Sequence, residues 1–160
     1  MTGYLGLGSN LGDSLARLRA VPPALERREV AVSGSSSVYE TAPQGEVTEQ
    51  PDFLNACLRV ETESEPEHLF DLCKAIEREL GRQPGVRHGP RPIDIDLLLL
   101  GTLEYRSERL TLPHPELLSR RFVLEPLLEL EPGLTLPDGT PLAAALGRVK
   151  DQRVRPIGPL

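Results

Sequence analysis

Tryptophan is absent from this chain of 160 residues, and phenylalanine, cysteine and lysine are scarce. The two cysteines, Cys57 and Cys73, lie in apolar stretches without the spacing of metal ligands, so we expect buried thiols. No run of about 18 apolar residues is present, which excludes a hydrophobic membrane-spanning helix. The first residues, 1–4, carry neither the basic nor the apolar block of a secretion signal. We therefore expect a cytoplasmic protein.

The composition is that of one folded domain, which we expect to span residues 1–160. Hydrophobic residues make up 39% of the chain and charged residues 26%, a balance typical of folded rather than disordered proteins. No internal repeat, low-complexity tract or linker divides the sequence. Because it holds 16 prolines and 14 glycines, many loops are expected.

Positive charge comes almost entirely from arginine and is unevenly distributed. The formal net charge of −6 argues against a dedicated nucleic-acid binder. However, residues 82–91 contain Arg82, Arg87, His88 and Arg91 and no Asp or Glu. Because a guanidinium binds phosphate through two parallel hydrogen bonds, a small polyanion is a candidate ligand.

Hydrophobic periodicity predicts the strands. They are expected over residues 4–8, 30–41, 53–62 and 93–100, with weak pairing of 103–105 with 109–111. The strand over 53–62 has two different faces. Alternate apolar residues from Leu54 to Val60 form a core face, while the opposite face presents Phe53 beside Asn55. That opposite face is either the exposed half of an antiparallel sheet or a binding surface.

The helices are predicted from their caps and apolar stripes. The first begins at Asp13 or Ser14, and Pro22 and Pro23 should kink or interrupt it. The second begins at a capping box of Ser64 and Glu67 and ends at Gly81. Shorter helices are expected over 115–118, 121–130 and 141–146. The order β-α-β-β-α-β predicts a ferredoxin-like α+β sandwich, with helices on one face of a mainly antiparallel sheet, followed by a C-terminal extension.

Asp94 and Asp96 are the most specific chemical signal in the sequence. At positions i and i+2 of a strand their carboxylates share one face, about 6.5 Å apart at the backbone. Two like charges this close repel, and a divalent cation removes the conflict. Oxygen ligands of this kind suit Mg²⁺, with phosphate completing its shell, and Arg91 can neutralise further phosphate oxygens. A solvated acidic edge is the alternative.

The common phosphate-binding motifs are missing. No Lys-Ser or Lys-Thr pair follows a glycine-rich loop. Residues 6–12 have the spacing Gly-x-Gly-x-x-x-Gly, which differs from a dinucleotide fingerprint and is interpreted as a tight strand-to-helix turn. The three histidines have no metal-ligand spacing. His68 is expected on a helix surface, whereas His88 and His114 are better candidates for phosphate contacts.

Five segments, in order along the chain, resemble the 6-hydroxymethyl-7,8-dihydropterin pyrophosphokinase family. They are residues 6–13 (GLGSNLGD), 50–55 (QPDFLN), 89–96 (GPRPIDID), 112–115 (LPHP) and 120–127 (RRFVLEPL). The Asp-x-Asp segment with its Gly-Pro-Arg lead is the most specific of them. The resemblance therefore covers nearly the whole chain.

The resemblance implies an ATP-dependent pterin pyrophosphokinase with a ferredoxin-like fold. Members of the family transfer diphosphate from ATP to the hydroxymethyl group of 6-hydroxymethyl-7,8-dihydropterin and release AMP, a step of folate biosynthesis. The resemblance also implies two Mg²⁺ ions, held by Asp94 and Asp96, with ATP as co-substrate. We expect small-molecule substrates, no nucleic acid, no membrane and a monomer.

Roles for individual residues follow from the resemblance alone. Those implied to be catalytic are Arg82, Arg91, Asp94 and Asp96. The pterin is implied to stack between Phe53 and Phe122, and to bind Asn55 and the backbone at Thr41, Ala42 and Pro43. Nucleotide contacts are implied for Glu77, Arg109, Thr111, His114 and Arg120. The chain departs from the family pattern at Lys74, where a glutamine can occur, at His88, where a large aromatic is common, and at Pro84, which replaces an arginine. We expect Lys74 and His88 to contact the nucleotide as well, and Arg87 to supply the missing charge.

A non-catalytic small-molecule sensor is the alternative function, because ferredoxin-like domains often bind ligands without turning them over. RNA binding on an open sheet is disfavoured by the acidic balance and by the lack of paired aromatics in a basic strand. An Asp96→Ala substitution discriminates between the first two. An enzyme would lose turnover, whereas a sensor would lose only ligand affinity.

Overall fold

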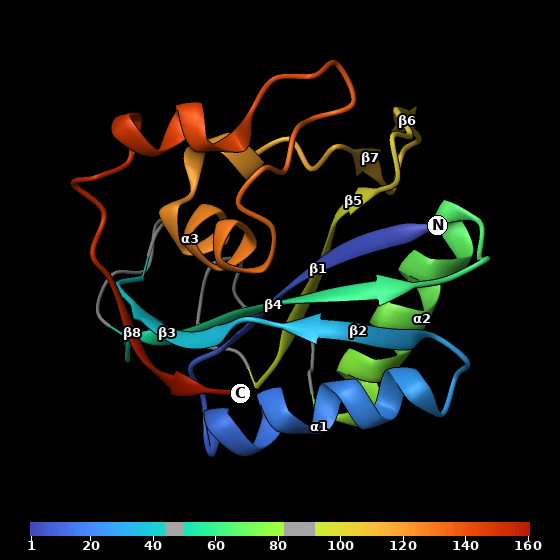
Figure 1. Ribbon diagram of the computed structural model, residues 1–160. Helices are drawn as coiled ribbons and strands as arrows, with labels where there is room; N and C mark the ends of the chain where they lie inside the picture. The colour runs from blue at the N-terminus through green and yellow to red at the C-terminus, as the bar shows by residue number, and fades with distance from the viewer. Residues whose placement is uncertain (44–49, 82–91) are drawn as a thin grey trace.

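A six-stranded sheet forms the centre of the molecule. The computed structural model describes residues 1–43, 50–81 and 92–160. The strands of the sheet are β1 (Thr2–Ser9), β2 (Ala31–Ser35), β3 (Ser37–Thr41), β4 (Phe53–Glu61), β5 (Asp94–Leu100) and β8 (Val154–Pro159). Their order is β5-β1-β4-β3-β8, with β2 also pairing with β4, and the pairings described are antiparallel (Figure 1).

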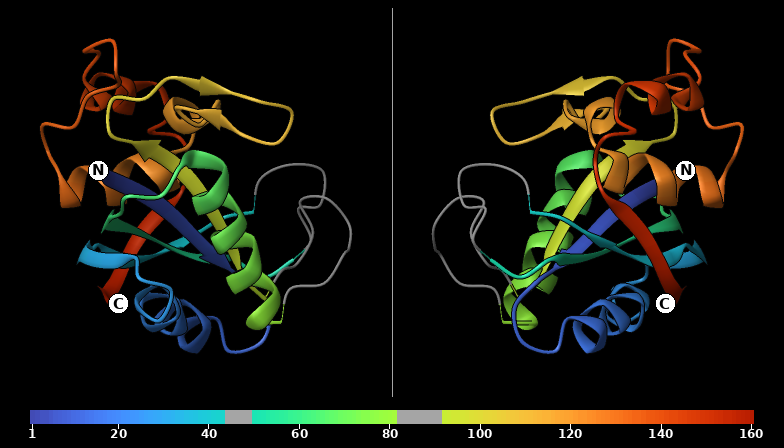
Figure 2. Two further views of the ribbon diagram at one scale, coloured as in Figure 1. Left: turned by 90° about the vertical axis from the view of Figure 1, so that its right-hand side faces the viewer. Right: turned by 90° about the vertical axis from the view of Figure 1, so that its left-hand side faces the viewer.

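Helices cover both faces of the sheet. The helices α1 (Ser14–Glu26) and α2 (Pro66–Glu79) lie on one face, and α3 (Arg121–Leu130) lies on the other with the short helices η1 (Leu117–Ser119) and η2 (Leu142–Arg148) (Figures 1 and 2). A two-stranded hairpin of β6 (Tyr105–Arg106) and β7 (Thr111–Leu112) follows β5. The predicted βαββαβ order is confirmed. The expectation of helices on one face only is wrong, because α3 buries its own apolar stripe against the second face.

Two hydrophobic cores result, one on each side of the sheet. The first gathers Leu58 and Val60 of β4 with side chains of α1 and α2. The second gathers Cys57 of β4 with Val123 and Leu127 of α3. Strand β4 is therefore buried on both faces through its middle, which rules out an exposed second face there. Both cysteines are free and buried, as predicted.

The ends of the first helix follow its local sequence. The Asp13 carboxylate caps α1 by accepting from the Ala16 N–H at 3.1 Å, as predicted. Pro22 and Pro23 do not interrupt the helix, which continues to Glu26. They are tolerated near the C-terminal end because Val21 and Leu25 on either side are fully buried. Packing of the apolar face therefore outweighs the lost backbone hydrogen bonds.

The second helix begins differently from the prediction. Its N-cap residue is Glu65, which makes no side-chain capping bond, and Pro66 occupies the first turn. The expected capping box is therefore wrong, because the Glu67 carboxylate bonds instead to the β6–β7 hairpin and the Ser64 N–H donates to Thr62. The predicted end is confirmed, since Gly81 follows the helix with a φ of +101°, a conformation that favours glycine.

Two further differences concern the edges of the sheet. The strand expected over 30–41 is divided into β2 and β3 at Ser36, with a register shift between Val32 and Gly34. Strand β8 was not predicted, and it pairs with β3. Across the part of the chain that the structure describes, no helix combines the length and hydrophobicity needed to cross a membrane.

Candidate active site

A cavity of about 240 Å³ opens between β1, β4 and β5 of the sheet and the start of α3. We call it the first cavity. Its lining comes from segments far apart in the sequence and consists of Gly6, Leu7, Gly8, Thr41, Ala42, Phe53, Asn55, Ala56, Asp94, Asp96, Glu116, Ser119, Arg120, Phe122 and Val123. The two aromatic residues, the amide and the two aspartates that the sequence singled out therefore share one hollow.

The floor of the first cavity is formed by glycines of β1. In the register of the sheet, Gly8 lies between Asp94 on β5 and Asn55 on β4, and Gly6 lies beside Asp96. Because neither glycine carries a side chain, no atom rises from β1 between the aspartates and the amide. The hollow is thus a consequence of two small residues at alternate positions of a central strand.

Asn55 is buried and held in a fixed orientation. Its Oδ1 accepts from the Thr41 hydroxyl at 2.7 Å, and its Nδ2 donates to the Leu7 carbonyl at 3.2 Å. A Cβ atom at Gly8 would lie 2.9 Å from that Nδ2, which is too close for a side chain. An amide has two N–H donors and two acceptor lone pairs, so Asn55 retains hydrogen-bonding capacity toward the cavity.

Two aromatic rings line the same cavity from different elements. Phe53 is the first residue of β4, and Phe122 lies in the first turn of α3. The guanidinium of Arg120 lies 5.5 Å from the centre of the Phe122 ring. Thr41 and Ala42 also line the cavity, whereas Pro43 is not among its lining residues within the described ranges. A flat, conjugated ring is the kind of ligand that such walls favour.

The aspartates form the electrostatically strained part of the cavity. Burial and the neighbouring Asp94 charge raise the pKa of Asp96 to about 7, although the Arg120 guanidinium opposes the shift. The nearest atoms of Arg120 and Asp96 are 3.9 Å apart, and Arg120 also pairs with Glu116. The two neighbouring carboxylates repel each other, so a cation bound between them would relieve the repulsion.

The chemistry of this donor set fits Mg²⁺. Asp94 and Asp96 offer carboxylate oxygens on one face of β5 at the wall of an open cavity, which leaves room for water and phosphate ligands. Within the described ranges, no group of three or more His, Cys, Asp and Glu gathers to hold a metal. From the described ranges, the protein would thus contribute two carboxylates, and oxygens of water and phosphate would add to the shell.

A second cavity, of about 230 Å³, shares Asp96 with the first cavity. Its lining consists of Phe70, Ile95, Asp96, Leu97, Ser107, Glu108, Arg109, Leu110, Thr111, His114 and Pro115. Three residues with implied nucleotide contacts, Arg109, Thr111 and His114, therefore come together here. Asp96 lines both cavities, so a group bound in one can meet a group bound in the other at this carboxylate.

His114 presents a neutral ring to the second cavity. Its Nδ1 accepts from the Glu116 N–H at 3.1 Å, which places the remaining proton on Nε2. Burial, and then the positive charge of Arg120, lower the pKa of His114. The imidazole is therefore a hydrogen-bond donor through Nε2 at neutral pH, as a ligand rich in oxygen acceptors would require.

Lys74 and Glu77 stand outside the lining of both cavities. Glu77 is 3% exposed, and its carboxylate accepts from the Ile95 N–H at 2.7 Å and pairs with Lys74 at 3.1 Å. Ile95 lies between the two aspartates in the chain. Glu77 thus connects α2 to the start of β5, a structural contact that the sequence analysis did not predict.

Four residues singled out by the sequence, Arg82, Arg87, His88 and Arg91, lie outside the described residues. Other lining residues were missed by the sequence analysis. Gly6 and Gly8 are placed by the sequence in the strand over 4–8 and the turn that follows, with no role in a site, although their two-residue spacing within a strand is a usable signal. Glu116 and Phe70 carried no local pattern that distinguishes them from surface and core residues.

Comparison with known proteins assigns the chain to a family. Residues 4–132 match the family described as 7,8-dihydro-6-hydroxymethylpterin-pyrophosphokinase (HPPK). The chain is 35% identical over 160 residues to the 2-amino-4-hydroxy-6-hydroxymethyldihydropteridine pyrophosphokinase of Haemophilus influenzae, covering 99% of each chain. It is 43% identical over 126 residues to the mitochondrial folate synthesis bifunctional protein of Arabidopsis thaliana, covering 79% of this chain and 23% of that one.

The folds agree as well. A crystal structure of HPPK-DHPS in complex with substrates superposes with a TM-score of 0.71, covering 92% of this chain and 43% of that chain. The sequence identity is 12%, so this likeness concerns the fold alone. The chain spans about a quarter of the length of the Arabidopsis relative, and nearly the full length of the Haemophilus one. With more than three quarters of its residues matched, this chain belongs to the 7,8-dihydro-6-hydroxymethylpterin-pyrophosphokinase family.

Proposed function

We propose that this protein transfers the diphosphate of ATP to the hydroxymethyl group of 6-hydroxymethyl-7,8-dihydropterin, releasing AMP. The observation that carries the proposal is the position of Asp96, which lines two cavities of different character. One is walled by aromatic rings and an amide and suits a pterin. The other is walled by Arg109, Thr111 and His114 and suits a nucleotide. The diphosphate would pass from the nucleotide in the second cavity to the pterin in the first cavity beside Asp94 and Asp96.

The first cavity would hold the acceptor. A pterin is flat, so the rings of Phe53 and Phe122 can stack on it, and Asn55 can pair with its amide edge. Because Thr41 and the Leu7 carbonyl fix the Asn55 amide, the orientation of the bound pterin is set before binding. The backbone at Thr41 and Ala42 supplies further polar groups beside it, and we extend this role to Pro43.

Asp94 and Asp96 would hold two Mg²⁺ ions. When bound, these ions neutralise charge on the transferred phosphates and lower the pKa of the attacking hydroxyl. The role of the aspartates is to stay ionised and to fix that charge at the junction of the cavities. Arg120 adds a guanidinium on the same side, and neutral His114 can donate from Nε2 to a phosphate oxygen.

The remaining positive charge would come from residues near the phosphates. Arg82 and Arg91 are proposed as catalytic phosphate contacts on their match to the family. Arg87 and His88 are proposed as nucleotide contacts because they lie in the same segment, 82–91, which is rich in arginine and has no Asp or Glu. Lys74 and Glu77 are proposed beside the nucleotide. In the reaction, the pterin hydroxyl releases its proton to water and its oxygen forms a bond to the β-phosphorus. The bond between the β-phosphorus and the α–β bridging oxygen breaks, and AMP leaves with that oxygen. The chain's contribution is positioning and charge neutralisation.

The test is a nucleotide assay with ATP, Mg²⁺ and 6-hydroxymethyl-7,8-dihydropterin. We expect AMP only when all three are present. Asp96→Asn removes the shared carboxylate charge and should lower turnover by at least about a thousandfold, whereas Asp151→Asn, an exposed aspartate far along the chain, serves as the matched control. Appearance of ADP would indicate an ordinary kinase. Binding of the pterin without any nucleotide product would favour the sensor.

A further inference from the structure

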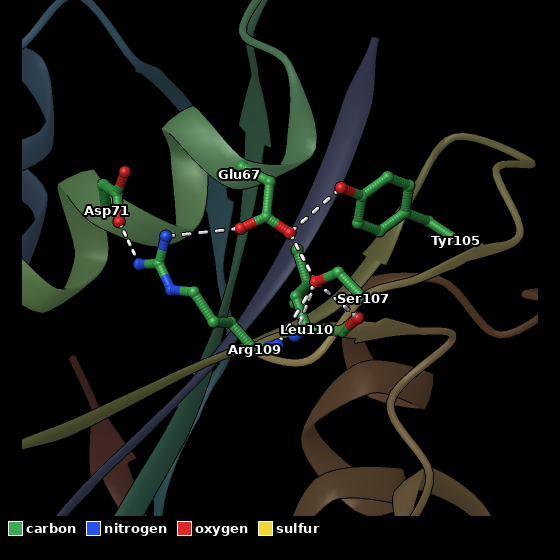
Figure 3. Close-up of polar contacts among 6 residues, drawn as sticks. All are labelled: Glu67, Asp71, Tyr105, Ser107, Arg109 and Leu110. Carbon is green, nitrogen blue, oxygen red and sulfur yellow. Dashed lines mark hydrogen bonds and ion pairs between the residues drawn. The ribbon is translucent and has the colours of Figure 1, made fainter.

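One carboxylate on α2 contacts three side chains of the hairpin that follows β5. The Glu67 Oε2 accepts from the Ser107 hydroxyl at 2.6 Å and from the Tyr105 hydroxyl at 3.0 Å. The Glu67 Oε1 accepts from Nη1 of Arg109 at 3.3 Å. Figure 3 shows the three side chains converging on Glu67 from the hairpin. A residue that reads as part of a helix cap in the sequence is thus the centre of a long-range network.

The hairpin needs such support because it is short. Strands β6 and β7 share only the pairs Tyr105–Leu112 and Arg106–Thr111, and an isolated hairpin of this size is unstable in water. Its turn is organised by Ser107, whose hydroxyl accepts from the Arg109 and Leu110 N–H groups at 3.3 and 3.2 Å while it donates to Glu67. Glu67 therefore holds Ser107 in place, and Ser107 in turn holds the backbone of the hairpin turn.

This hairpin is also a wall of the second cavity. The consecutive residues from Ser107 to Thr111 all line it, opposite Phe70 of α2 and Asp96 of β5. The position of that wall relative to α2 determines the width of the cavity. No other carboxylate in the described ranges bonds to both Tyr105 and Ser107.

Arg109 is constrained by the same surface of α2. Its guanidinium bonds to Asp71 as well as Glu67, and it lies 5.0 Å from the centre of the Phe70 ring. A guanidinium neutralised by two carboxylates is a weaker ligand for phosphate than a free one. This geometry favours a role for Arg109 in shaping the wall, with its charge directed at α2.

We propose that Glu67 is a positioning residue of the second cavity, which holds the β6–β7 hairpin at the distance from α2 that nucleotide binding requires. The proposal rests on the proposed function, because it takes ATP as the ligand of that cavity. It assigns Glu67 no contact with the substrate. Its effect passes through Ser107, Tyr105 and Arg109.

The test compares four variants with the wild-type protein, three of them at Glu67 and Glu104 and the fourth at Ser107. Glu67→Ala removes all three contacts, whereas Glu67→Gln keeps an amide oxygen that can accept from Ser107 and Tyr105. Glu104→Gln, an exposed glutamate beside the hairpin and outside both cavity linings, is the matched control. The measurements are KM for each substrate, calorimetric binding of α,β-methylene-ATP, and amide hydrogen exchange over residues 105–112.

For Glu67→Ala we expect the KM for ATP and the Kd for α,β-methylene-ATP to rise roughly tenfold, with the KM for the pterin unchanged. Hairpin amides should exchange faster in the same variant. Glu67→Gln should restore most of the affinity, and Glu104→Gln should match wild type. Ser107→Ala, which removes the central hydroxyl, should reproduce the direction of Glu67→Ala.

Several outcomes would overturn the positioning role. One is faster hairpin exchange with unchanged affinity for the analogue, and another is an equal loss of affinity for both substrates, which indicates a general structural defect. If the wild-type protein makes AMP and the variants behave like Glu104→Gln, only this proposal fails. If the wild-type protein neither makes AMP nor binds the analogue, the proposed function fails and this inference falls with it.

Discussion

At the scale of single residues, the first cavity depends on an absent side chain. Asn55 is held by Thr41 and Leu7 in an orientation that only a glycine at position 8 leaves free. Position 8 must therefore be glycine, because a Cβ atom there would lie 2.9 Å from the amide nitrogen of Asn55. The missing side chain at position 8 thus keeps the Asn55 amide in place in the lining of the first cavity.

Gly8→Ala should damage pterin binding selectively. The added methyl group forces the Asn55 amide away from its two partners, so we expect the KM for the pterin to rise on the order of tenfold, with the KM for ATP little changed. Gly133→Ala is the matched control, because a Cβ atom there would meet nothing within 4 Å. Steady-state kinetics with each substrate varied in turn measures both. Equal effects of the two substitutions would contradict the importance of this contact.

The sequence was most informative about residues whose chemistry conflicts with their surroundings. Asp94 and Asp96 stand in an apolar strand, so they could be singled out as candidate site residues, and both line the first cavity. Gly6 and Gly8 could not be assigned to the cavity floor, because that role depends on the register between β1 and β5. The role of Glu67 in the hairpin network was likewise hidden, since its partners lie about 40 residues away in the sequence.

At the scale of elements, the contact of α2 with β5 supports the aspartate pair. The buried Glu77 carboxylate accepts from the Ile95 N–H, which lies between Asp94 and Asp96 in the chain. A buried carboxylate that satisfies a backbone donor is costly to remove, because the donor is then left without its partner. The helix thereby holds the strand from which both aspartates project.

Glu77→Ala should therefore lower the free energy of unfolding by about 1–3 kcal/mol. Glu77→Gln should lower the free energy of unfolding by less than Glu77→Ala, because its amide oxygen can still accept from the Ile95 N–H. Glu79→Ala is the matched control on the same helix, since this exposed residue pairs with Arg27 and Arg28 at the surface and should cost at most about 1 kcal/mol. Urea unfolding followed by circular dichroism measures all three. A Glu77→Ala variant as stable as Glu79→Ala would refute this account.

Helices and strands were predicted where a local sequence pattern indicates them, and missed where they form only through contacts with distant segments. The apolar stripe of α3 predicted a helix over 121–130, and the structure has it at Arg121–Leu130. Its docking on the second face of the sheet was not predictable, because nothing in the stripe says which surface it covers. Strand β8 contains Pro156, Gly158 and Pro159, a composition typical of loops, and it forms only because the edge of β3 offers partners.

At the scale of the whole molecule, the sheet joins two cores that each contain one cysteine. Cys73 belongs to the core beneath α1 and α2, and Cys57 to the core beneath α3. Burial raises the pKa of the Cys73 thiol to about 12 and that of Cys57 further still. Both thiols are therefore protonated and unreactive in the folded protein at neutral pH.

The thiols report whether the two cores open together. Because β1, β4 and β5 contribute side chains to both cores, we expect one cooperative unfolding transition. In intermediate urea, both cysteines should react with a thiol reagent with the same opening free energy. Single-cysteine variants, Cys57→Ala and Cys73→Ala, separate the signals. Labelling of Cys57 at a lower urea concentration than Cys73 would show instead that the α3 side opens independently.

The raised pKa values of the two thiols make the free energy of unfolding depend on pH in the alkaline range. The folded state keeps both thiol protons, whereas the unfolded chain releases them once the pH rises above about 9. Because the unfolded state then binds fewer protons than the folded state, the free energy of unfolding falls as the pH rises. The double variant Cys57→Ala, Cys73→Ala should lose part of this dependence.

Strand β8 has a consequence for how the molecule behaves among copies of itself. It lies beyond residue 132, where the match to the family ends, yet it pairs with β3 from Ser37 to Thr41. Its prolines put residues without N–H donors at the border of the sheet, which discourages addition of a further strand. Removal of residues 154–159 would uncover the backbone of β3, and we expect such a shortened chain to aggregate through strand pairing.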